Sequence, residues 1–76
     1  MREYVHELVV EVKVRMLDAA AISEDAFKDF IDQVVDEWLE YGQIHEDDDL
    51  EGLKSLAYNM WETVREELVG EPDEIV

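Results

Sequence analysis

The most acidic run of the chain has the residue types of a calcium site. Asp47, Asp49 and Glu51 fall at the first, third and fifth positions of an EF-hand loop, and Gly52 falls at the sixth. The twelfth position should supply a bidentate glutamate, but it is Tyr58. Carboxylates are also favourable near a helix N-terminus. We therefore interpret the run as an acidic helix start and predict no metal site.

Other catalytic chemistry has little support in the sequence. The two histidines, His6 and His45, do not form a paired ligand motif such as H-x-x-x-H, and there is no cysteine. Ser23 suits a helix cap, Ser55 lies inside an expected helix, and the three glycines form no phosphate-binding loop. We expect no cofactor and no enzymatic activity, because a small helical chain leaves little room for a pocket that desolvates a carboxyl group.

A row of carboxylates is the strongest candidate for a functional surface. At 100° per residue five acids fall within an arc of about 80° on one helix, spaced roughly 5 to 6 Å along its axis. They are Asp25, Asp29, Asp32, Asp36 and Glu40. Four more acids follow beyond the end of that helix, namely Glu46, Asp47, Asp48 and Asp49. The spacing resembles that of phosphates along a nucleic-acid strand, which are roughly 6 to 7 Å apart.

This row predicts a protein that imitates the charge of a nucleic-acid backbone and occupies the DNA or RNA site of a basic partner. The partner would be a basic nucleic-acid-binding protein, which carries a complementary groove. Small acidic inhibitors of this kind are familiar from viruses and mobile elements, and a viral origin is suggested by that analogy alone. One alternative is a solvated face that serves only solubility or adaptation to salt.

Hydrophobic periodicity predicts an all-α fold, a small three-helix bundle. Ser23 caps a helix over 24–41, which Gly42 ends. A third helix begins with Asp48 as its cap and Glu51 in a capping box, and it continues to about residue 68. Its apolar stripe, like that of the second helix, contains a tryptophan, and we assign Trp38 and Trp61 to the core.

The first segment, 3–21, is ambiguous between helix and strand. Residues 10–16 alternate as a half-buried strand would, but a lone strand would have no partner, and a helical stripe extends further. We predict a helix with Val5, Leu8, Val9, Val12, Met16, Ala19 and Ala20 on its buried face.

The helical assignment leaves a second apolar strip on the same segment. It consists of Val10, Val14 and Leu17. The strip either packs under the other two helices or forms an interface, and a homodimer is one candidate. An adaptor module that docks a partner helix on this strip is the second functional hypothesis, with the acidic surface then serving solubility.

Composition sets the remaining limits. The 76 residues carry 22 Asp and Glu against 6 Lys and Arg, a net charge of −16, and 47% are hydrophobic. We expect one folded domain over residues 1–70 with a short acidic tail at 71–76. The charge argues against direct contact with nucleic acid or an anionic membrane. No apolar run approaches the roughly 18 residues of a membrane span, and the lack of cysteine favours a cytoplasmic location.

Overall fold

A computed structural model describes residues 2–69, which form four helices and no strand. The helices are α1 (Arg2–Ala19), α2 (Glu24–Tyr41), α3 (Leu50–Tyr58) and α4 (Trp61–Val69). The prediction of an all-helical fold is confirmed, and the strand alternative for residues 10–16 is wrong. The predicted acidic tail at 71–76 lies outside the described residues.

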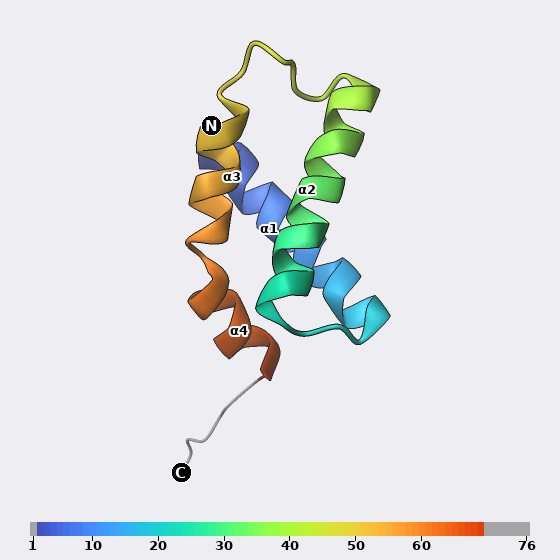
Figure 1. Cartoon of the computed structure of the whole chain (residues 1–76), viewed down its shortest axis with the longest axis vertical. Coiled ribbons are helices and arrows are strands. Elements are labelled where there is room, and N and C mark those ends of the chain that lie inside the picture. The colour runs from blue at the N-terminus through green and yellow to red at the C-terminus, as the bar shows by residue number, and fades with distance from the viewer. Residues whose placement is uncertain (1, 70–76) are drawn as a thin grey trace.

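The helices form two layers (Figure 1). In Figure 1, α2 and α3 lie side by side and α1 crosses behind them, so that α1 contacts both. The buried side chains of the described residues are all hydrophobic. Helix α1 contributes Val5, Leu8, Val9, Val12 and Met16, α2 contributes Phe27, Ile31, Val34 and Val35, and the rest are Ile44, Leu53, Ala57 and Val64. The predicted core face of α1 is therefore correct up to Met16, whereas Ala19 and Ala20 are exposed.

Helix α1 ends two residues earlier than predicted. The amide of Ala21 donates to the carbonyl oxygen of Met16 at 3.0 Å, and the amide of Ala20 donates to that of Leu17 at 3.2 Å. This pair of bonds is a Schellman turn, which needs a left-handed residue at its centre, and Ala20 has φ 53°. Because a right-handed helix cannot continue through a left-handed residue, Ala20 and Ala21 lie outside α1.

Helix α2 has the predicted bounds and caps. Ser23 Oγ accepts a hydrogen bond from the amide of Ala26 at 3.1 Å. At the other end Gly42 has φ 83°, and the amide of Gln43 donates to the carbonyl oxygen of Trp38 at 2.9 Å. Here the left-handed position of a second Schellman turn is occupied by glycine, which adopts that conformation without a steric penalty.

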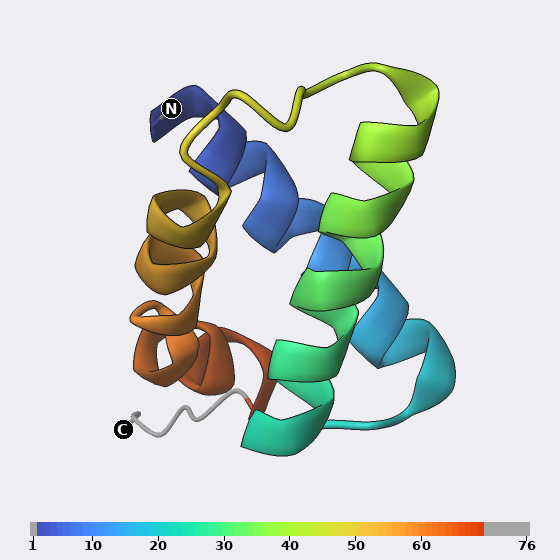
Figure 2. The same cartoon turned by 45° about the horizontal axis from the view of Figure 1, so that its top comes forward.

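The single third helix of the prediction is instead two helices. The amide of Met60 donates to the carbonyl oxygen of Ala57, three residues back, so the chain tightens and turns between α3 and α4. Figure 2 shows α4 turning toward the start of α2. The Trp61 ring lies 5.3 Å from that of Phe27, and Val64 is buried. The assignment of the apolar stripe to the core is therefore correct. The turn between α3 and α4, which brings the second half of the stripe against α2, is not predicted by the sequence.

No helix in the described part of the chain is long and apolar enough to cross a membrane.

Candidate acidic binding surface

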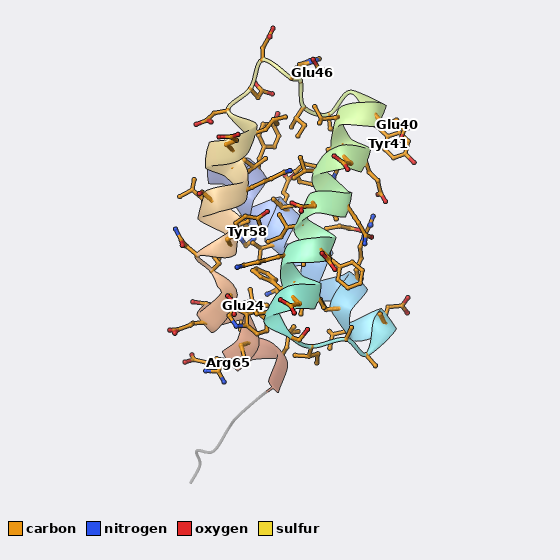
Figure 3. The ribbon with its side chains drawn as sticks, in the orientation of Figure 1. Glu24, Glu40, Tyr41, Glu46, Tyr58 and Arg65 are labelled. Carbon is orange, nitrogen blue, oxygen red and sulfur yellow. The ribbon has the colours of Figure 1, made fainter. Side chains whose placement is uncertain are left out.

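The outer side of α2 carries four exposed carboxylates. Asp25, Asp29, Asp36 and Glu40 are all exposed, and among the side chains that the structure describes none of them makes an ion pair or accepts a side-chain hydrogen bond. We call these four residues the outer acidic row. Figure 3 shows Glu40 at the end of α2, pointing away from the bundle.

Asp32 does not belong to this row in the structure. Its Oδ1 accepts a hydrogen bond of 2.8 Å from the Tyr58 hydroxyl on α3, and Lys54 Nζ lies 3.4 Å from the same oxygen. Figure 3 places Tyr58 on α3, the helix beside α2. Burial, and then the bond to Asp32, raise the pKa of the Tyr58 hydroxyl. The fifth predicted member of the row therefore holds α2 against α3.

Removal of Asp32 from the row leaves two pairs of carboxylates. Asp25 and Asp29 are about 6 Å apart along the helix axis, as are Asp36 and Glu40, at 1.5 Å rise per residue. The interval from Asp29 to Asp36 is about 10 Å by the same rise. The row is consequently less regular than the sequence suggests, although its members stay within an arc of about 60°.

Of the four acids that follow α2, two have side chains that accept backbone hydrogen bonds. Glu46 and Asp47 are exposed. Asp48 Oδ2 accepts a hydrogen bond of 2.9 Å from the amide of His45, and Asp49 Oδ1 accepts one of 3.0 Å from the amide of Gly52. The cap of α3 is therefore Asp49, and the prediction of Asp48 is wrong by one residue.

The loop between α2 and α3 places the exposed pair at the same end of the molecule as Glu40. Ile44 is buried and anchors the loop, and Figure 3 shows Glu46 near the top of the loop. Among the described side chains, no group of three or more His, Asp or Glu could hold a metal ion.

Among the described side chains, four basic residues form ion pairs, namely Lys13, Arg15, Lys28 and Lys54, and three of them do so between helices. Arg15 on α1 donates to both carboxylate oxygens of Glu37 on α2 and, at 3.1 Å, to Glu11. Lys13 on α1 pairs with Glu67 on α4. The Lys54 contact to Asp32 joins α3 to α2, whereas Lys28 pairs with Glu24 within α2 at 3.6 Å.

The Arg15 pair is the most extensive of these contacts, and it was not predicted. The hydrogen bonds from Arg15 lower the pKa of Glu37, and the same contact, together with Glu11, raises the pKa of Arg15. The four-residue step from Glu11 to Arg15 was a usable signal in the sequence. The contact to Glu37 depends on how α1 crosses α2, for which the sequence offers no local signal.

The apolar strip of α1 does not pack under the other helices. Val10, Val14 and Leu17 are 41%, 57% and 57% exposed. An open hollow of about 440 Å³ lies at the C-terminal end of this strip and is lined by Val14, Arg15, Leu17 and Asp18. Packing of the strip under the other two helices is therefore excluded, and its role as an interface stays a prediction.

Comparison with protein families, curated proteins and solved structures finds no match to this chain.

Proposed function

We propose that this protein binds the nucleic-acid site of a basic partner protein and thereby blocks it. The observation that carries the proposal is the outer acidic row, Asp25, Asp29, Asp36 and Glu40, which is exposed and has no basic neighbour bonded to it in the described residues. Such a row repels itself, at a cost of a few tenths of a kcal/mol for each i,i+4 pair. Interspersed lysines would have removed that cost.

The mechanism is electrostatic and involves no chemical step. The carboxylates of the row, with Glu46 and Asp47 at the same end as Glu40, take positions that phosphates would occupy in a basic groove. Charge complementarity raises the association rate, because the field of the protein steers the encounter. The net charge of −16 adds to this long-range attraction.

The contacts of Asp32 fix the orientation of the helix that carries the outer acidic row. Because Asp32 bonds to Tyr58 and Lys54, α2 is fixed against α3, and the row sits on a helix that has little freedom to rotate. A fixed row loses less conformational entropy on binding than a mobile one.

The test begins with capture of proteins from a host lysate on the immobilised chain. Excess double-stranded DNA is then added as a competitor. A partner whose nucleic-acid site is occupied should be displaced by DNA and should dissociate as salt rises toward 0.5 M, since screening weakens exposed charge contacts. Retention of every captured protein in the presence of DNA would contradict the proposal.

A matched pair of variants then separates geometry from total charge. The triple change of Asp25, Asp29 and Asp36 to Asn removes three charges from the row and keeps side-chain shape. The control changes Glu51, Glu62 and Glu66 to Gln, three exposed acids on α3 and α4. We expect the first variant to bind the captured partner more slowly and with a smaller salt slope, and the control to bind nearly as the natural chain does. Equal weakening by both would show that only bulk charge matters.

A further inference from the structure

The apolar strip on α1 has the spacing of a helix-docking seam. Val10, Val14 and Leu17 follow one another at steps of four and three residues, which places them in one line along the helix. All three are more than two-fifths exposed, and Val14 and Leu17 form part of the lining of the open hollow of about 440 Å³. An exposed line of aliphatic side chains that partly lines a shallow hollow is an arrangement that can receive the apolar residues of a second helix.

One edge of the strip is acidic. At 100° per residue Glu7 and Asp18 lie next to the strip on the same side. Both are exposed, and neither makes an ion pair with any other side chain that the structure describes. On the other edge Lys13 is already paired with Glu67. A helix that fits this surface therefore needs Lys or Arg beside its apolar residues on the side that faces Glu7 and Asp18.

A second copy of the chain fits the strip poorly. The three residues expose on the order of 200 Å² together, since a whole Val or Leu side chain offers roughly 100 Å². A standard interface buries about 800 Å² on each partner, so most of a dimer interface would have to come from polar surface. Each copy would also bring a net charge of −16. Like-charge repulsion therefore opposes self-association and favours a basic partner.

We propose that the α1 strip docks a basic amphipathic helix of another protein. The helix inserts apolar residues spaced i, i+4 and i+7 along Val10, Val14 and Leu17, and its Lys or Arg residues face Glu7 and Asp18. This inference rests on α1 alone and is independent of the function proposed for the row on α2. It names the class of partner that the exposed strip and its acidic edge would recognise.

The experiment uses the full chain and a fluorescein-labelled model peptide of 18 residues. The peptide carries Leu at i, i+4 and i+7 positions and Lys along one flank, and a scrambled peptide of the same composition is the reference. Fluorescence anisotropy in 0.5 M NaCl suppresses general attraction between charges, whereas apolar burial persists. We expect the amphipathic peptide to bind at least tenfold more tightly than the scrambled one.

Matched variants locate the binding. The double change Val14→Ser and Leu17→Ser should abolish the preference for the amphipathic peptide. Leu56→Ser, which alters a 47% exposed leucine on α3, should leave it unchanged. At 0.1 M NaCl the change Glu7→Gln with Asp18→Asn should weaken binding of that peptide several-fold more than Glu62→Gln with Glu66→Gln. Circular dichroism of each variant would show whether it still folds. Val14→Thr, which is nearly isosteric, is a milder change that should weaken binding while the helices remain folded.

Two results would overturn the inference. Equal binding of both peptides would show that the chain attracts any basic peptide. A natural chain that is dimeric by light scattering, and that the Val14 and Leu17 double variant converts to a monomer, would show that a second copy covers the strip.

Discussion

The hydroxyl of Tyr58 donates a hydrogen bond of 2.8 Å to Oδ1 of Asp32, which joins the C-terminal end of α3 to the middle of α2. Lys54 Nζ approaches the same oxygen, and Lys28 Nζ lies 5.7 Å from the centre of the Tyr58 ring. One carboxylate, one phenol and two ammonium groups thus fill the edge of the contact between two helices. This polar cluster lies at one edge of a core in which no described polar side chain is buried.

Replacement of Tyr58 by Phe should destabilise the fold at pH 7 by about 1 kcal/mol, because Asp32 loses its neutral donor and keeps only Lys54. Burial and Asp32 raise the pKa of Tyr58 in the folded chain above its ordinary value near 10. The stabilising contribution of the protonated phenol is therefore complete below about pH 10 and is lost as the pH rises through the folded pKa. Urea unfolding at several pH values should show the natural chain and the variant converging above pH 10. A constant difference at every pH would contradict this assignment.

A methyl group at the left-handed position should be unfavourable in both Schellman turns, so removing it from one and adding it to the other should have opposite effects on stability. Ala20→Gly should stabilise the chain by up to about 1 kcal/mol, because the left-handed conformation at φ 53° is strained for alanine. Gly42→Ala should destabilise it by about 1 kcal/mol for the same reason, at φ 83°. A Cβ at position 42 would meet no atom within 4 Å, so the effect there comes from the backbone alone. Thermal unfolding of the two variants, compared with the exposed control Ala19→Gly, would check both signs.

The contact between Arg15 and Glu37 predicts a specific loss of stability in acid. Arg15 lowers the pKa of Glu37 in the folded chain, so the stabilisation is present above the unfolded value near 4.3 and is lost as the pH falls through the folded pKa. Arg15→Gln should remove that part of the acid transition. Lys28→Gln, which breaks an exposed pair within one helix, should change it less. Chemical unfolding between pH 2 and 7 would distinguish the two, and equal effects would show that the Arg15 pair contributes no more than a surface pair.

Neutralisation of the acids on α2 should change stability in two directions. The triple change of Asp25, Asp29 and Asp36 to Asn should raise the free energy of unfolding by a few tenths of a kcal/mol, because it removes self-repulsion on an exposed face. Asp32→Ala should lower it by roughly 1 to 2 kcal/mol, because Tyr58 and Lys54 lose their shared acceptor. Urea denaturation at low ionic strength measures both. A stabilising effect of Asp32→Ala would mean that this residue behaves as another member of the row.

Local signals in the sequence were sufficient for the helices and most of the core. Ser23 and Gly42 defined α2 to the residue, because each cap acts on the backbone beside it. The end of α1 was missed because alanine is a good helix former, and nothing in its type indicates the left-handed conformation of Ala20. The turn at Met60 was missed because the apolar stripe continues across it, and the stripe alone does not report a change of direction.

The composition of the acidic row depends on tertiary contacts that the sequence does not display. A helical projection places Asp32 among the exposed acids, because it treats α2 as an isolated helix. In the folded chain Asp32 lies toward α3, where Tyr58 and Lys54 reach it. Its neighbours Asp29 and Asp36 are exposed, as the projection predicts.

The placement of the ion pairs makes folding and the proposed binding respond oppositely to ionic strength. Lys13, Arg15 and Lys54 lie where helices meet, so the outer side of α2 is compensated mainly by cations from solution. Added salt accumulates around the carboxylates and weakens their mutual repulsion more than it weakens the few partly shielded pairs. The folded chain therefore gains stability in the salt range where a basic partner would be released. Under the proposed function, the chain would stay folded while a basic partner dissociates, and it could bind the partner again when the salt concentration falls.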